Sequence, residues 1–161
     1  MRSEQTAQLT SNKLQEMNIE IITKDTELTI YGFSGTAFNK DYAGTAFKLS
    51  GKMWETVKAN NLKNKGLNIW VYEPNDGVFA GVELENIPSS DIGLEQKIIL
   101  LKKYAYFKHI GSVKLLKQVG TNMISELKSK GLETELPYIE IYGHWTSDET
   151  KYETELLMTL K

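Results

Sequence analysis

The sequence predicts an α+β fold built from two similar halves of one chain. Strand-like and helix-like stretches follow in the order strand, strand, helix, strand, turn, strand, and this order occurs twice in 161 residues. Residues 67–72 also align with residues 138–142, so that Trp70 corresponds to Glu140 and Tyr72 to Tyr142. This duplication predicts two lobes related by a pseudo-twofold axis with a cleft along it, and such clefts are common sites for small molecules.

The composition places the chain in a broad class. Apolar residues make up 40% and charged residues 25%, as in a globular protein, and we expect one domain over residues 17–161 after a polar segment at 1–16. Repeat one covers about 17–86 and repeat two about 94–161. The net charge of -2 argues against direct binding of nucleic acid by this chain.

The residue types exclude further classes of site. The chain has no cysteine, which excludes disulfides, thiolate metal sites and thiol nucleophiles. It begins with a polar stretch rather than a signal peptide, and no apolar run is long enough for a membrane span, so we expect a cytoplasmic protein. His109 and His144 are too few and too isolated for a metal site, and no cofactor is expected.

The first half is expected to contain two strands, a helix and a hairpin, in that order. The polar start, to about residue 15, predicts a frayed end or short helix. Two strands follow at 17–22 and 28–33, then a loop at 34–45 and a helix beginning at Ala46. The helix has one apolar face and ends at Asn60 and Asn61; the face consists of Ala46, Phe47, Ser50, Met53, Trp54 and Val57. A hairpin comes next, with strands at 67–72 and 78–84 around a turn at 73–77.

The second half begins after a linker at 86–93. Strands are expected at 96–101 and 104–110, and Gly111 with Ser112 offers a helix start, with Ser112 as the N-cap. The helix presents one apolar face and stops at Gly131; the face consists of Val113, Leu116, Val119, Met123, Ile124 and Leu127. Closing strands are expected at 137–142 and 152–160, joined by a turn at 143–151.

The strand at 137–142 carries the most informative pattern. Because side chains alternate across a strand, Ile139 and Ile141 share one face while Tyr138, Glu140 and Tyr142 share the other. The isoleucine face suits a core. A carboxylate between two phenol rings suits a pocket better than a dry core, and indicates binding of a cationic or amphipathic small molecule.

Three stretches together carry a resemblance to a known family. They are KYAYFKHIG at 103–111, LPYIEIY at 136–142 after one helix, and ELLMTL at 155–160. In these the chain resembles the GyrI-like, or AraC-type, effector-binding domain, over about residues 17–161. The resemblance implies two β-α-β-β repeats that form one curved antiparallel sheet with two main helices. It also implies a pocket for small molecules, often hydrophobic cations, with a glutamate at the position of Glu140.

The chain departs from that family in two places. Many relatives carry the domain behind a DNA-binding helix-turn-helix, whereas only about sixteen polar residues precede the first strand here. We therefore expect a sensor that signals through another chain or sequesters its ligand. Thr159 stands where relatives often have proline, which should be structurally mild.

Glu140 is the main candidate for a binding residue. The alternative is a glutamate in an ordinary surface ion pair, which would contribute little. Among aromatic rings its carboxylate is poorly solvated, so its pKa should rise unless a cation compensates. Ring faces would add cation–π attraction of about 0.5–2 kcal/mol per contact. The ligand-binding candidates beside Glu140 are Trp54, Trp70, Tyr72 and Tyr142, followed by Tyr31, Phe33 and Tyr106.

Two other functions stay open at this point. Glu155, on the closing strand, is either an exposed partner for a lysine or a second pocket carboxylate; with Glu140 it would permit the acid–base chemistry of GyrI-like hydrolases. No residue can be singled out as a nucleophile. The third function is binding to a protein partner, as the gyrase-inhibitor relatives do. The oligomeric state does not follow from the sequence.

Overall fold

The computed structural model describes residues 17–161, so the expectations for the polar segment at 1–16 lie outside the described residues. One antiparallel sheet of eight strands runs through the molecule in the order β1-β6-β8-β7-β3-β4-β2-β5. The strands are β1 (Glu20–Ile22), β2 (Thr26–Thr36), β3 (Asn68–Glu73), β4 (Gly77–Val82), β5 (Glu95–Leu101), β6 (Tyr104–Ile110), β7 (Thr134–Tyr142) and β8 (Glu153–Leu160).

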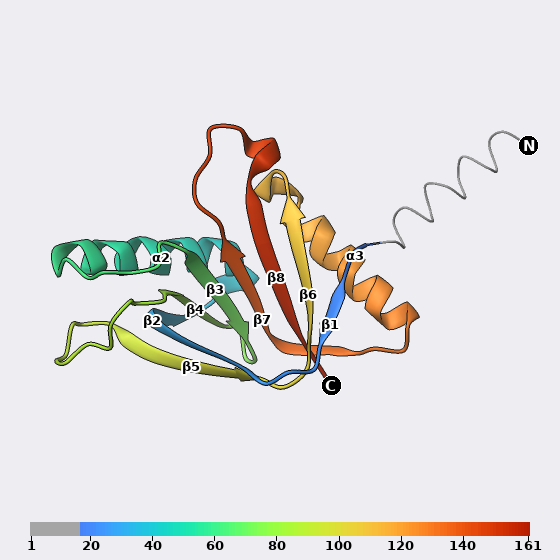
Figure 1. Ribbon diagram of the computed structural model, residues 1–161, viewed down its shortest axis with the longest axis horizontal. Coiled ribbons are helices and arrows are strands. Elements are labelled where there is room, and N and C mark those ends of the chain that lie inside the picture. Colours follow the sequence, from blue (N-terminus) through green and yellow to red (C-terminus); the bar gives the residue numbers. More distant parts are fainter. Residues whose placement is uncertain (1–16) are drawn as a thin grey trace, which may run out of the picture.

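Two long helices complete the α+β fold. Helix α2 (Tyr42–Ala59) packs on the half of the sheet with β2 and β4, and α3 (Leu116–Ser129) packs on the half with β6 and β8. Figure 1 shows them on opposite sides of the central strands β3 and β7. Short 3₁₀ turns lie at η1 (Phe38–Lys40), η2 (Val113–Leu115) and η3 (Glu149–Lys151).

The sheet is curled like half of a barrel, and its two faces have different partners. The face inside the curl is filled by apolar side chains from most strands: Ile30, Ile69, Val71, Phe79, Ile99, Leu101, Tyr104, Ile139 and Leu157. The opposite face carries both helices, with Met53 and Val57 of α2 and Met123 and Leu127 of α3 buried against it. As predicted, Ile139 belongs to the core while Glu140 points to the other face.

The strand order confirms the duplication and adds a detail that the sequence did not predict. Each half contributes four strands and one helix in the same order, but the first strand of each half pairs with the other half: β1 with β6, and β5 with β2. The halves meet at β3 and β7, where Trp70 lies directly opposite Glu140. The pseudo-twofold axis therefore passes through the pair of residues that the alignment made equivalent.

Several predicted boundaries are wrong in the first half. Strand β2 continues to Thr36 and α2 begins at Tyr42, so the loop predicted at 34–45 is much shorter. The helix starts early because the Asp41 carboxylate accepts a hydrogen bond from the Gly44 N–H at 3.0 Å and so caps it. Phe47, predicted to lie on the buried face, is 72% exposed, because that face is centred on Ala46, Ser50 and Met53.

The second half differs in smaller ways. Ser112 accepts a hydrogen bond from the Lys114 N–H and caps η2, while α3 itself begins at Leu116. Val113 lies in that turn and is 46% exposed rather than buried. Strand β7 begins at Thr134, ahead of Pro137, with an irregular register between Glu135 and Tyr138.

Candidate ligand-binding site

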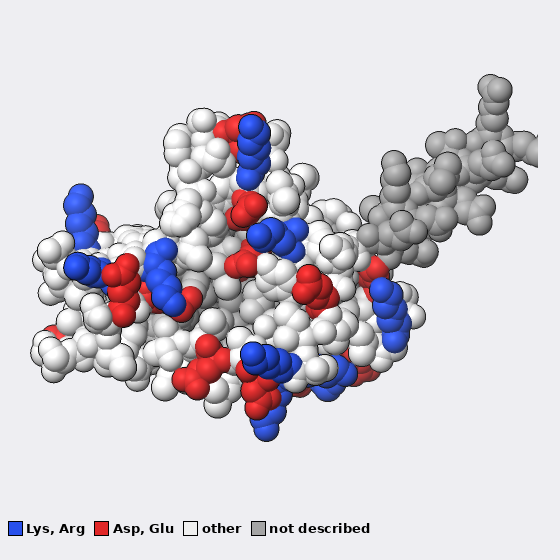
Figure 2. Space-filling view, in the orientation of Figure 1, with Lys and Arg blue, Asp and Glu red and all other residues white. Residues whose placement is uncertain are grey.

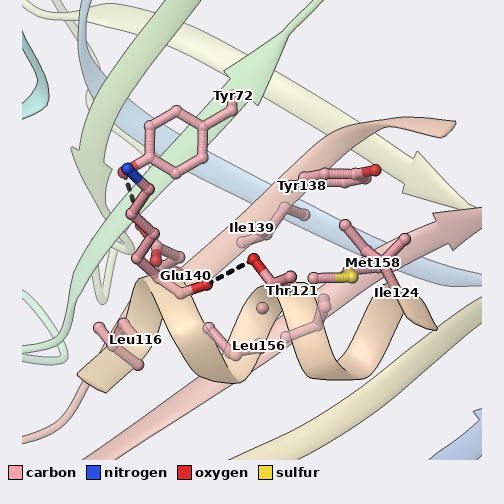
Figure 3. Close-up of a pocket in the computed structure, with 12 residues that line it drawn as sticks. Tyr72, Leu116, Thr121, Ile124, Tyr138, Ile139, Glu140, Leu156 and Met158 are labelled. Carbon is pink, nitrogen blue, oxygen red and sulfur yellow. Dashed lines mark hydrogen bonds between the residues drawn. The ribbon is translucent and has the colours of Figure 1, made fainter. Parts of the chain in front are cut away.

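Glu140 lies on the floor of the space between the two helices. It is on β7, next to β3, and its Oε1 atom accepts hydrogen bonds from the hydroxyls of Tyr72 at 2.5 Å and Tyr142 at 3.1 Å. Figure 3 shows Glu140 below the Tyr72 ring, near Leu116 at the start of α3. Two phenols therefore fix the carboxylate where the two halves meet.

Burial dominates the electrostatics of this group. It raises the pKa of Glu140, and the hydrogen bonds from Tyr72 and Tyr142 oppose the rise only in part. The pKa values of both tyrosines are raised too, first by burial and then by the charge of Glu140, so both remain neutral donors at physiological pH. Within residues 17–161, no lysine or arginine forms an ion pair with Glu140.

A groove of about 730 Å³ opens on one side of Glu140, within the size range of ligand pockets. Its apolar and aromatic lining comes from Tyr42, Tyr72, Leu116, Leu136 and Tyr138, and charged side chains of both signs stand around it: Lys40, Asp41, Glu73, Asp76, Lys114 and Lys117. The Tyr42 ring meets the Tyr72 ring edge-on at 6.2 Å, and its hydroxyl donates to Asp76 at 2.5 Å.

The groove continues under α3 as a smaller apolar pocket of about 210 Å³. Tyr72, Tyr138 and Glu140 line both spaces. Figure 3 shows Ile124 and Met158 at the end of this pocket that is far from Glu140. A ligand with an apolar part can therefore enter beside the carboxylate without displacing it.

A second groove, of about 530 Å³, lies on the other side of Tyr142 and is mainly aromatic. The Trp70 and Tyr142 rings are 4.7 Å apart between centroids and tilted by 58°. Trp54 of α2 and Trp145 of the β7–β8 connection also line it. The indole N–H of Trp70 is buried and has no hydrogen-bond partner among the described residues.

Five of the predicted binding residues line the grooves, in two groups: Tyr72 and Glu140 line the larger groove. Trp54, Trp70 and Tyr142 line the second one. The other three lie elsewhere. Tyr31 accepts a hydrogen bond from Gln96 near the β5 edge, and Phe33 packs under α2 with Lys52 over its ring at 4.2 Å. Tyr106 lies on the inner face of the sheet, next to the apolar core.

Glu155 does not share a site with Glu140. It pairs in register with Ile141, which puts it on the inner face of the sheet. There it accepts a hydrogen bond from the Tyr106 hydroxyl at 2.5 Å, and burial raises the pKa of that tyrosine. The acid–base pair considered from the sequence is therefore not assembled.

Sequence reasoning missed several residues of the grooves. Leu116 carried a helical-face signal that predicted core packing, and its side chain both packs and lines the pocket. Tyr42 fell in the predicted loop. Lys117 and Trp145 lie in stretches without a pattern that points to a site.

The structure gives no sign of a metal site or a membrane-spanning helix in residues 17–161. Over residues 17–161, no group of three or more histidine, aspartate or glutamate side chains could hold a metal ion. In the same part of the chain, no helix is long and apolar enough to cross a membrane. His109 contacts the Ser112 carbonyl through Nε2 at 3.0 Å, which is a structural hydrogen bond.

The fold and the site define a class: an α+β domain with a ligand-sized cleft at its pseudo-twofold axis. No family model matches the sequence, and no curated protein matches it. Several solved structures are similar in fold to this chain. The C-terminal domain of EcmrR is 14% identical with a TM-score of 0.69, over 90% of this chain and 99% of that one. In an EcmrR–DNA complex the match covers 99% of this chain and 63% of the other, at 14% identity and a TM-score of 0.66.

Two more structures have the same fold. SAV2435 bound to tetraphenylphosphonium is 20% identical with a TM-score of 0.59, over 91% of this chain and 94% of that one. A hydrolase from Listeria innocua is 12% identical with a TM-score of 0.53, over 95% of this chain and 98% of that one. The fold expected from the resemblance to GyrI-like effector-binding domains is confirmed, and at these identities the likeness shows the fold alone.

Proposed function

We propose that this chain binds amphipathic, cationic small molecules in the cleft between α2 and α3, with Glu140 as the counter-charge. One observation carries the proposal: a half-buried carboxylate with a raised pKa, held by two neutral phenols and paired with no cation of residues 17–161, lines a groove of about 730 Å³. A carboxylate that has lost part of its hydration and has no opposite charge beside it is destabilised, and a bound cation would offset that cost.

The aromatic walls fit the same ligand class. A cation over the face of a tyrosine or tryptophan gains about 0.5–2 kcal/mol, more when water is excluded. Tyr42, Tyr72 and Tyr138 line the groove that Glu140 also lines, and Trp70 and Trp54 line the neighbouring groove beside Tyr142. Ring faces demand no single shape, so we propose that the cleft accepts several flat or branched organic cations. The likeness to SAV2435 bound to tetraphenylphosphonium supports this choice of ligand.

A thermal-shift titration tests the proposal. Tetraphenylphosphonium should raise the unfolding midpoint, because a ligand at 100 times its Kd stabilises the folded state by about 2.7 kcal/mol. Triphenylphosphine oxide, a neutral molecule with similar rings, is the matched control and should raise it much less. Equal shifts with both compounds, or no shift with a panel of aromatic cations, would refute the role of charge.

Binding is expected to depend on pH through Glu140. As the pH falls through the raised pKa of Glu140 the carboxylate gains a proton, so affinity for a permanently charged cation should fall. Tyr72→Phe removes a hydrogen bond that favours the ionised form, so the loss of affinity should begin at a higher pH. Calorimetric titrations with tetraphenylphosphonium between pH 5 and pH 8 would measure the shift.

The control for that variant is Tyr106→Phe. Tyr106 donates to Glu155 on the inner face, so its loss removes an equivalent hydrogen bond away from the cleft. The pH dependence of binding should then match that of the unmodified protein. A profile that moves equally in both variants would show that Tyr72 does not act through Glu140.

A second candidate is hydrolysis with Glu140 as general acid–base. The raised pKa of this carboxylate favours it, because such groups work best near the operating pH, and the likeness to the Listeria innocua hydrolase adds support. It requires turnover of an ester or amide substrate that disappears in Glu140→Gln. Cation binding without turnover would decide for binding alone.

We also propose that ligand binding by this chain serves to regulate transcription. The likeness to EcmrR in its DNA complex supports a role beside a transcription regulator, signalling through another chain. Figure 2 shows acidic and basic side chains interspersed on the face that it presents. Three expectations from the sequence stay predictions. They are that this chain makes no direct contact with nucleic acid, that it is cytoplasmic, and that it has a protein partner.

A further inference from the structure

The groove beside Glu140 has two sides that differ in charge. One side is formed by η2 and the start of α3, and its charged lining residues are Lys114 and Lys117, without an acidic residue. The other side is formed by η1, the start of α2 and the β3–β4 hairpin, and it carries three acidic residues and Lys40. A ligand in the groove therefore meets an uneven distribution of charge.

The acidic residues of the second side already have partners. Each carboxylate accepts a hydrogen bond or forms an ion pair within the domain: Asp41 with the Gly44 N–H at 3.0 Å, Asp76 with the Tyr42 hydroxyl at 2.5 Å, and Glu73 with Lys97 at 2.6 Å. Hydrogen bonds to an ionised group are stronger than those between neutral groups. These three charges are therefore stabilised within the domain before a ligand binds.

Lys114 and Lys117 have no such partner. Both are exposed, and within residues 17–161 neither ammonium group forms an ion pair. The hydrogen bonds of these residues are made by their backbone: the Lys114 N–H donates to Ser112, and the Lys117 carbonyl accepts from Thr121. Two positive charges on one side of a ligand-sized groove are therefore free to meet an anionic group.

The two lysines share their space with the proposed counter-charge. Lys117 lines both the groove and the smaller pocket under α3, as Glu140 does. Lys114, three residues earlier, lines the same groove, as expected for positions that lie on one side of a helical stretch. One small molecule in this groove of about 730 Å³ can therefore reach Glu140 and both lysines.

We propose that the ligand is a zwitterion, in which the cation held at Glu140 is joined by a short chain to an anionic group that lies at Lys114 and Lys117. This inference rests on the proposed function, because it needs a cation at Glu140. A ligand with a positive charge alone is repelled by both lysines, and an anionic group adds attraction that offsets this repulsion. Because exposed ion pairs contribute little, we expect the anionic group to raise the affinity by about two- to fivefold.

Two related phosphonium compounds test the inference. Carboxybutyl-triphenylphosphonium is a zwitterion at pH 8, whereas its methyl ester keeps only the positive charge. Calorimetry at low salt should show that the unmodified protein binds the acid more tightly than the ester, and high salt should reduce the difference.

The outcomes separate this inference from the proposed function. Equal affinities for the two compounds, or tighter binding of the ester, would overturn the inference and leave cation binding at Glu140 untouched. Failure of both compounds in a protein that binds tetraphenylphosphonium would overturn it too. If none of the three compounds binds, the proposed function fails together with the inference.

Two double variants locate the anionic group. Lys114→Gln with Lys117→Gln should fold, since both side chains are exposed, and should lose the preference for the acid. It should also bind the ester more tightly, because two repelling charges are gone. Lys102→Gln with Lys128→Gln is the matched control, since it removes two exposed charges that line none of the grooves described above, and it should keep the preference. A preference that survives in the first variant, or that both variants lose equally, would overturn the assignment to Lys114 and Lys117.

Discussion

Replacing Glu140 by glutamine is expected to weaken cation binding and, at the same time, to stabilise the empty protein. Glutamine keeps the size of the side chain and an oxygen that can accept from Tyr72 and Tyr142, so only the charge is removed. Affinity for tetraphenylphosphonium should fall at least about tenfold, which corresponds to about 1.4 kcal/mol. Calorimetry at pH 8 measures the loss.

The stability effect has a definite sign. The pKa of Glu140 is raised on folding, so its protonated form favours the folded state at low pH, and this contribution is lost as the pH rises through the raised value. At pH 8 the unmodified protein bears a half-buried charge that Glu140→Gln lacks. The unfolding midpoint of the variant should therefore exceed that of the unmodified protein, by more at pH 8 than at pH 5.

Glu155→Gln is the control for this experiment. It neutralises a carboxylate that also accepts from a tyrosine, but on the inner face of the sheet. It should leave cation binding unchanged. If both variants lose affinity equally, the effect comes from overall charge, and Glu140 is not the counter-charge.

Replacing Gly32 by alanine is expected to destabilise the fold strongly. Gly32 on β2 lies opposite Gly81 on β4, and a Cβ atom at position 32 would overlap the Ala80 carbonyl oxygen and come within 2.6 Å of the Gly81 Cα. Both obstacles are backbone atoms in the middle of the sheet, so no side-chain rotation relieves the clash. Overpacking of this kind costs about 1–3 kcal/mol and sometimes more.

Chemical denaturation of Gly32→Ala and of a matched variant, Gly51→Ala, would measure this cost. Gly51 is an exposed position in α2 where an added Cβ meets nothing within 4 Å. Alanine there should stabilise the helix by about 0.5–1 kcal/mol. A Gly32→Ala variant as stable as the unmodified protein would mean that β2 and β4 can move apart enough to admit the added Cβ atom.

Much of the architecture could be predicted because it depends on patterns of apolar and polar residues among near neighbours in the sequence. Alternation of apolar and polar residues assigned Ile139 to the core and Glu140 to the opposite face. The helical period at Met53, Met123 and Leu127 assigned the buried faces of both helices. The internal alignment made Trp70 equivalent to Glu140, and the two lie opposite each other in the sheet.

The candidates that lie outside the two grooves show what local sequence patterns do not predict. Tyr31, Phe33 and Tyr106 have the same residue chemistry as the aromatic residues that line the grooves beside Glu140 and Tyr142. Which face of the curled sheet each occupies, and which helix covers it, depends on strands that are distant in sequence. The face that Glu155 occupies could not be predicted for the same reason, because its register with Ile141 fixes that face and no local signal reports the register.

The sequence by itself determined the class of fold, the duplication and the unusual strand with a carboxylate between phenols. Only the tertiary structure decided that β1 and β5 exchange between the halves and that Tyr72 as well as Tyr142 donates to Glu140. It also decided that one groove opens beside Glu140 and another beside Tyr142. The physical reason is that periodicity and residue type act over a few neighbours. Strand pairing and the curl of a sheet depend instead on contacts between distant parts of the chain.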